Sequence, residues 1–363
     1  MPEFPETIGL VVTGILFGLG AAVFQSFSYV FSRRFLKECS AKPQHLFAMS
    51  HLLMGVMALG ALPLLKQNPL PPLNQWAWYL IGTAGCYLLA QLFLFTALNR
   101  SDSSKIAPLL GLKIPTLAFL SWALFQDMPS VIAWFAIFLC VAAGAIISPP
   151  SGVPQIQVLL LVLSACLGYC ISDLCIPHLV DALSRTSEHP TLLGVSLTYI
   201  ACGAVGAIAT FIQKIHRTPR IAVFAFPHAL SWLIGISFLF ACFATLGVVA
   251  GNMLQATRGI WSVFLGMAIT AAGLLHIDDV SSRRVLVRRI IGAVIMTTSI
   301  VVYLHVEHRE ARTKSEQREA VSHHNAESCG CSVFADSQSV VVPPSRLVPG
   351  LPARRAYSSE RLR

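Results

Sequence analysis

Charged residues are scarce in this sequence. Asp, Glu, Lys and Arg together make up 12% of its 363 residues, whereas hydrophobic residues make up 55%. A soluble protein of this length needs more polar side chains than this to cover its surface, and the mean hydropathy of +0.67 points the same way. The composition therefore excludes a soluble globular protein and predicts an integral membrane protein.

The sequence also lacks the motifs of several kinds of enzyme. It contains no HExxH motif and no pair of catalytic aspartates, and His178, His228 and His276 form no evident zinc-binding set. We therefore expect no enzymatic activity, no catalytic residue, no bound metal and no cofactor. An intramembrane enzyme is a less favoured alternative.

The excess of basic residues is a poor sign of nucleic-acid binding. The formal net charge is +9, but nine of the basic residues follow Val306, in a segment that also holds seven acidic residues. We expect no nucleic-acid partner. The expected partners are a small-molecule substrate and membrane lipid, and a homodimer is left open.

Ten apolar stretches are long enough to cross a bilayer, because a hydrocarbon core of about 30 Å needs about 20 apolar residues in a helix. The opening residues, MPEFPETIG, contain no basic residue and lead into the first stretch, so we expect no cleaved signal peptide. The ten stretches are 7–31, 45–65, 75–98, 103–125, 130–148, 158–179, 191–213, 227–250, 252–275 and 289–306.

The stretches divide into two sets of five, which predicts an all-α membrane protein with two repeats. Residues 1–148 form the first repeat and residues 157–306 form the second. The proline-rich residues 149–156 form the loop that connects the two repeats. Asp127 and Asp279 each lie 13 residues before a small residue, Cys140 and Gly292. An odd number of helices inverts the second repeat in the membrane, and such inverted repeats place a binding site near the midplane between them.

Residues 307–363 are polar and rich in Pro, Ser and Arg near the end, so we expect a disordered C-terminal tail. Four residues of this tail are potential metal ligands, but their spacing matches no structural zinc site. They are His323, His324, Cys329 and Cys331.

The segment FTALNRSDSSKIAPLLGLKIPTLAFLSWALFQDM, residues 95–128, resembles the third-to-fourth helix segment of the EamA-type drug/metabolite transporter superfamily. The matching positions are Ala97-Leu98, Ser103-Ser104-Lys105, Pro115 and Gln126-Asp127. The departures are Asp127, where Glu is usual, and Lys113, where a small residue is common. The resemblance covers residues 7–306 and implies ten helices and a secondary transporter of a small metabolite. The shorter motif LKIPT is also similar to nucleotide-sugar transporters, a branch of the same superfamily.

Lys113 lies about 15 Å into the fourth stretch, near the expected midplane. A charge at this depth is costly unless it faces a cavity or a partner, so we predict that Lys113 binds an anionic substrate. The alternative is a lysine that reaches the interface or is satisfied by carbonyl groups. Pro115 clashes with the carbonyl group of Gly111, which predicts a helix kink around Lys113.

Asp173 and Arg258 are expected about 8 and about 9 Å from the same membrane face. We predict an ion pair between them, with Asp173 as a candidate for proton coupling; the alternative is that Arg258 reaches the interface and Asp173 caps a local backbone group. Gln25 and Gln91 lie deep in the first and third stretches, where they either contact substrate or join helices through hydrogen bonds.

The predicted function is transport of a small metabolite, with anionic character expected from Lys113, by alternating access. A non-transporting sensor or a lipid flippase on the same fold is the alternative. We expect the plasma (inner) membrane, and the resemblance implies that both termini are cytoplasmic. The basic loop residues instead favour the opposite orientation, because they crowd the side away from the N-terminus.

Overall fold

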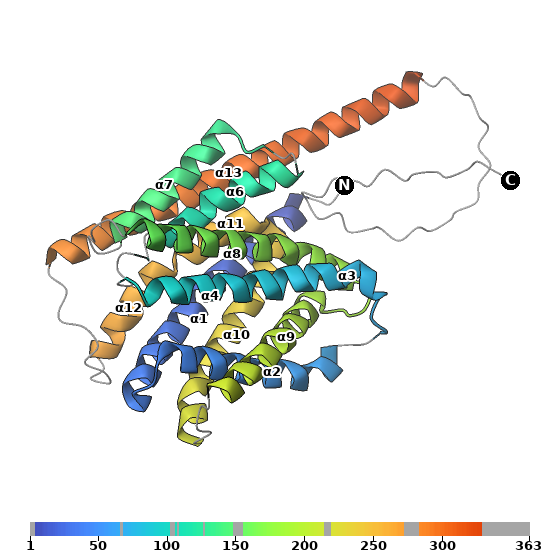
Figure 1. Cartoon of the computed structure of the whole chain (residues 1–363). Helices are drawn as coiled ribbons and strands as arrows, with labels where there is room; N and C mark the ends of the chain where they lie inside the picture. The colour runs from blue at the N-terminus through green and yellow to red at the C-terminus, as the bar shows by residue number, and fades with distance from the viewer. Residues whose placement is uncertain are drawn as a thin grey trace. The chain divides into compact units, whose positions relative to one another are not determined.

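The computed structural model describes residues 4–65, 68–101, 106, 109–125, 128–147, 155–213, 219–271 and 283–328. Every regular element among these residues is a helix (Figure 1). The chain divides into two compact units, Met1–Leu304 and His305–Arg363. All residues of the candidate site lie in the first unit.

The α-helices and two shorter helical segments follow one another along the chain. The π-helix η1 interrupts the third apolar stretch, and the 3-10 helix η2 precedes α6. The elements are α1 Phe4–Cys39, α2 Pro43–Leu65, α3 Leu73–Leu80, η1 Ile81–Gly85, α4 Cys86–Leu98, η2 Leu109–Leu112, α6 Lys113–Phe125, α7 Val131–Ile147, α8 Ile156–Leu183, α9 Pro190–Ile212, α10 Pro219–Leu246, α11 Val248–Ala256, α12 Arg258–Ala271 and α13 Arg283–Ser328.

Seven helical segments within the described residues are long and apolar enough to cross a membrane. They are Gly9–Cys39, Pro43–Leu65, Leu73–Leu98, Ile156–Leu183, Pro190–Ile212, Arg220–Leu246 and Ile290–Glu307. Seven of the ten expected spans are thus matched, and the multi-pass membrane class is confirmed.

The other three expected spans are shorter or interrupted. The fourth and fifth correspond to the shorter apolar helices Leu109–Leu124 and Val131–Ile147. The ninth is divided into α11 and α12 by a turn at Thr257. The count of ten spans is therefore not confirmed, because an apolar stretch in the sequence does not require one unbroken helix.

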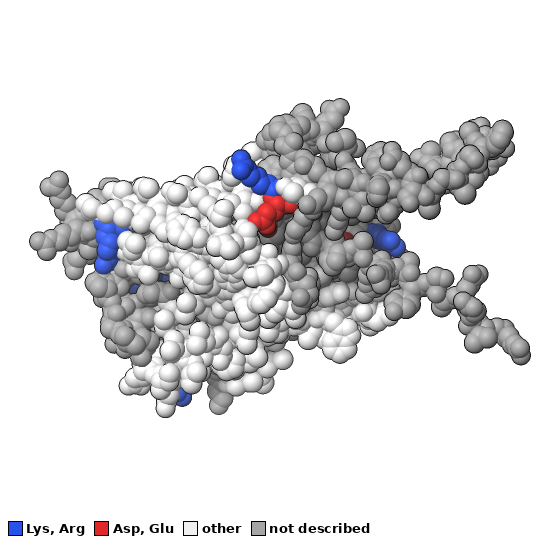
Figure 2. Space-filling view, turned by 90° about the horizontal axis from the view of Figure 1, so that it is seen from above, with Lys and Arg blue, Asp and Glu red and all other residues white. Residues whose placement is uncertain are grey.

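The outer surface of the first unit is apolar. Large hydrophobic side chains such as Leu16, Phe135 and Phe211 are 62%, 64% and 78% exposed. Figure 2 shows a broad uncharged surface with few Lys, Arg, Asp or Glu side chains among the described residues. Lipid tails solvate such side chains, so their exposure fits a protein that crosses the bilayer.

Each helix of residues 1–148 packs against a helix of residues 157–304. Helix α1 lies along α10, α2 along α9 and α4 along α8, while α6 contacts both α8 and α11 (Figure 1). Helix α7 meets α13, where Gly292 lies against Ile147 and Gly144 against Met296. The core of the unit is therefore built from both halves.

Glycines allow the closest of these helix contacts. A Cβ atom added to Gly55 of α2 would lie 2.6 Å from the Cα atom of Gly203 of α9, and the converse distance is the same. In α1, a Cβ atom on Gly18 would lie 2.6 Å from a side-chain carbon of Leu254. Small residues at membrane helix interfaces commonly permit such approaches.

Helix α13 runs without interruption to Ser328, so the polar segment after residue 306 begins as a helix. This part of the chain is rich in Glu, Arg, Lys and Ala, which are good helix formers. Of the potential metal ligands, Cys329 and Cys331 lie outside the described residues, as do the side chains of His323 and His324. Asp127 and most of the connecting segment 149–156 also lie outside them.

Candidate functional site

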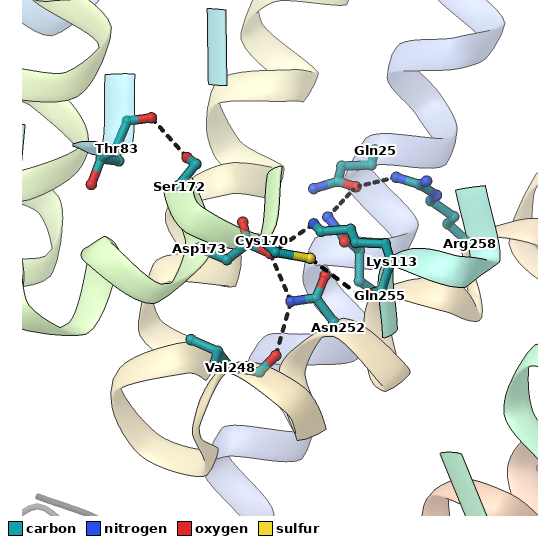
Figure 3. Close-up of polar contacts among 10 residues, drawn as sticks. All are labelled: Gln25, Thr83, Lys113, Cys170, Ser172, Asp173, Val248, Asn252, Gln255 and Arg258. Atoms are coloured by element: carbon teal, nitrogen blue, oxygen red, sulfur yellow. Dashed lines mark hydrogen bonds and ion pairs between the residues drawn. The ribbon is translucent and has the colours of Figure 1, made fainter. Parts of the chain in front are cut away.

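Six polar side chains meet between the two halves of the first unit, and we call them the polar cluster (Figure 3). They come from α1, α6, α8, α11 and α12. Its members are Gln25, Lys113, Asp173, Asn252, Gln255 and Arg258.

Lys113 and Asp173 form the charged centre of the polar cluster. The Nζ atom of Lys113 lies 2.7 Å from Oδ2 of Asp173, and the two side chains are only 17% and 9% exposed. The amide group of Asn252 donates to the same carboxylate oxygen at 2.8 Å and to the carbonyl oxygen of Val248 at 2.9 Å. The Lys113 ammonium also lies 5.5 Å from the ring centre of Tyr169. The pair is thus neutralised and held by a further hydrogen bond, as a buried ion pair requires.

The partner of Asp173 differs from the one that the sequence predicts. Lys113 occupies the position expected for Arg258, because α8 lies beside η2 and the start of α6. The thiol of Cys166 donates to the carbonyl oxygen of Leu109, and that of Cys170 donates to the carbonyl oxygen of Lys113 at 3.3 Å. Asp173 follows Cys170 by about one helical turn, within reach of the long lysine side chain.

Arg258 belongs to the second part of the polar cluster. Its guanidinium group lies 3.5 Å from Oε1 of Gln25, and Nε2 of Gln255 donates to the same oxygen at 3.0 Å. The guanidinium carbon lies 5.7 Å from the ring centre of Tyr29. Ser26 donates its hydroxyl to the carbonyl oxygen of Arg258 at 3.0 Å, which ties α12 to α1.

Gln25 is fully buried, with 0% of its surface exposed. Its Oε1 atom accepts two hydrogen bonds, but its Nε2 atom has no hydrogen-bond partner among the described residues. Buried polar atoms without a partner are uncommon because they lose their hydration without compensation. The amide nitrogen of Gln25 is therefore a buried donor that no described residue satisfies.

The backbone is irregular on both sides of the polar cluster. The 3-10 helix η2 contains Gly111 and changes to α-helix at Lys113, two residues before Pro115. Pro115 thus lies in the first turn of α6, where its missing N–H group breaks no α-helical hydrogen bond. On the facing side, the turn at Thr257 separates α11 from α12 immediately before Arg258. Non-helical backbone at membrane depth is tolerated where protein or a water-filled cavity lines it.

Gln91 lies outside the polar cluster. Its amide nitrogen donates to the Tyr87 hydroxyl at 3.1 Å, and Nε2 of His51 lies 3.2 Å from the same hydroxyl. The Tyr87 ring lies 6.2 Å from that of Tyr169, the residue beneath Lys113. Gln91 therefore supports an aromatic neighbour of the cluster.

Asn252 and Gln255 are cluster members that the sequence analysis does not single out. They precede Arg258 at intervals of three residues, in the pattern NxxQxxR. Residues three apart lie on one helix face, so three polar side chains at this spacing in an apolar stretch are a readable signal.

We expect replacement of Asn252 to weaken the site. Asn252→Leu removes one of the two donors to Asp173 and should lower the free energy of unfolding by about 1–3 kcal/mol. Asn252→Asp should be worse, because it places a second carboxylate beside Asp173. Thermal unfolding of the detergent-purified protein measures both effects. Asn99→Leu, at the exposed end of α4, is the control; equal effects at both positions would contradict a role for Asn252.

Comparisons with known proteins agree with the fold. Residues 12–148 match the EamA-like transporter family. Among solved structures, one titled "Crystal structure of protein" superposes with a TM-score of 0.58 at 13% sequence identity, over 80% of this chain and 97% of that chain. No curated protein sequence matches this chain. The structural likeness concerns the fold alone, whereas the family match confirms the resemblance for residues 12–148.

Proposed function

We propose that the chain is a secondary carrier, because residues 12–148 match the EamA-like transporter family and seven of its helices are long and apolar enough to cross a membrane. It moves a small anionic metabolite by alternating access. Its two halves, residues 1–148 and 157–306, form inverted repeats of five helices, with η2–α6, α7 and α11–α12 as the shorter or interrupted members.

The pairing of helices supports the inverted repeat. In the inverted repeat, α1 corresponds to α8, α2 to α9, α3–α4 to α10 and α6 to α11. Exchanging the two halves then turns the α1–α10 contact into the α8–α4 contact. The same exchange leaves the α2–α9 and α6–α11 contacts unchanged. A two-fold axis between the halves would produce this pattern, and carriers built from inverted repeats bind substrate at that interface.

The observation that carries the proposal is the polar cluster itself. Gln25 and Lys113 come from the first half, whereas Asp173, Asn252, Gln255 and Arg258 come from the second. Every polar contact that joins Lys113 to Asp173, or Gln25 to Gln255 and Arg258, therefore crosses between the halves. A rocking motion of the halves would break and re-form these contacts, which couples substrate binding to the change of access.

We propose the plasma (inner) membrane as the location, with both termini cytoplasmic. The basic residues near the start of the C-terminal segment, Arg309, Arg312, Lys314 and Arg318, add positive charge to that side. A reporter enzyme fused after Arg363 tests the orientation. Activity on the external side would reverse the assignment.

Counterflow in liposomes tests the proposed function. Purified protein is reconstituted with an internal mixture of organic acids, amino acids, sugar phosphates and nucleotides, and uptake of each labelled compound is followed. We expect saturable uptake of at least one anionic solute, driven by its unlabelled internal pool. Liposomes without protein are the control. Movement of labelled lipid without solute uptake would favour a flippase. The absence of both activities would favour a sensor.

A further inference from the structure

Within the described part of the chain, Arg258 is the cation of the polar cluster without a carboxylate partner, and the amide nitrogen of Gln25 is a buried donor without an acceptor. We infer that they bind a small monocarboxylate that carries a second acceptor oxygen, such as a hydroxyl or oxo group. The carboxylate binds Arg258, and the second oxygen accepts from Gln25 Nε2. This inference rests on the proposed carrier function and names its substrate class.

Charge selects a monoanion. The polar cluster contains two cations, Lys113 and Arg258, and one carboxylate, Asp173, which is already bound to Lys113 and Asn252. Within the described part of the chain, Arg258 forms no ion pair. An unmatched cation at membrane depth is costly, and one negative charge would neutralise it. A phosphate monoester would instead bring close to two negative charges and leave an excess.

The positions of the donors select a ligand with two acceptor sites. Oε1 of Gln25 lies 3.5 Å from the Arg258 guanidinium group. The oxygen and nitrogen of an amide are less than about 2.6 Å apart, so Gln25 Nε2 lies within about 6 Å of that group. In Figure 3 this nitrogen points away from Arg258. When a carboxylate binds Arg258, the Nε2 atom of Gln25 can donate a hydrogen bond to an oxygen on the adjacent carbon of the ligand.

The residues around Arg258 fix the orientation of its guanidinium group for binding a carboxylate. The Tyr29 ring lies under the guanidinium group, and Trp232 packs edge-on against Tyr29 with ring centres 6.3 Å apart. Gln25 Oε1 occupies one edge of the fork. A planar guanidinium group whose face is covered presents its remaining N–H groups in one plane, the geometry that a carboxylate matches.

Thermal unfolding of the full-length protein in detergent tests the inference, with ligands titrated at constant ionic strength. The probes are sodium lactate, sodium propionate, which lacks the second oxygen, glycerol 3-phosphate and sodium chloride. We expect lactate to raise the unfolding temperature most. Arg258→Gln should weaken lactate binding by about tenfold or more, because it removes a charge-assisted contact.

Two further variants assign the contacts. Gln25→Met should remove the difference between lactate and propionate binding, because it removes the donor to the second oxygen. Arg220→Gln is the control, since Arg220 is an exposed arginine whose side chain is 65% accessible; it should change nothing.

Each of the other outcomes would contradict one part of the inference. Equal binding of lactate and propionate by the unsubstituted protein would mean that the site does not recognise a second acceptor oxygen. Stronger binding of glycerol 3-phosphate would mean that the site does not prefer a monocarboxylate. If counterflow detects another solute while lactate neither binds nor competes, the inference fails and the carrier function stands. If no solute is transported at all, the carrier function fails with it.

Discussion

Replacement of Lys113 by Met is expected to abolish transport and to lower the free energy of unfolding by about 3–5 kcal/mol. The substitution keeps a long unbranched side chain but leaves the Asp173 carboxylate, 9% exposed, without its cation. Asp173→Leu should have a similar effect, because the ammonium of Lys113 then lacks its anion. Fluorescence-detected size-exclusion chromatography after graded heating measures the loss of stability.

The double variant Lys113→Met, Asp173→Leu separates loss of a charge from loss of a contact. A buried pair replaced on both sides leaves no unpaired charge, so the double variant should be more stable than either single variant. It should still fail to transport if the pair opens during the cycle. If the three variants unfold alike, the pair does not stabilise the fold in the way that its geometry indicates.

Replacement of Gly203 by Val should prevent folding of the membrane unit. A Cβ atom at this position would lie 2.6 Å from the Cα atom of Gly55, and backbone atoms cannot rotate away as a flexible side chain can. Forcing α2 and α9 apart should cost about 3 kcal/mol or more, the upper range for overpacked cores. The yield of monodisperse protein in detergent is the measurement.

Gly60→Val is the matched control, because it lies on the same helix as Gly55 and a Cβ atom there would meet nothing within 4 Å. It should be expressed like the unsubstituted protein. Gly55→Val should behave like Gly203→Val. A normal yield for Gly203→Val would mean that the two helices are not packed this closely.

The membrane class and the unusual residues are readable from the sequence, because charges in apolar stretches are rare and costly. Lys113, Asp173, Arg258 and Gln25 all belong to the polar cluster. Their pairing is not readable in the same way. It depends on where α6 begins and on its register against α8, whereas depth counted along an apolar stretch assumes an α-helix from the first residue.

The expected number of spans exceeds the number matched for a similar reason. Hydropathy indicates whether a segment lies in lipid, but not whether its backbone hydrogen bonds form one continuous helix. It therefore does not predict the turn at Thr257 or the 3-10 helix that precedes Lys113. Gln91 shows the other limit. Its depth suggests a substrate contact, but only the fold reveals that its neighbour Tyr87 takes its hydrogen bond.

The two cations and one carboxylate of the polar cluster give it a net charge of +1 when it is empty. Moving one elementary charge across a membrane potential corresponds to about 2.3 kcal/mol per 100 mV. In a carrier of this kind, voltage acts on the reorientation of the empty site, whereas a site neutralised by a monoanion crosses without electrical work. Membrane voltage would then change the rate at which the empty carrier returns, and it would contribute to the driving force of each transport cycle together with the substrate gradient.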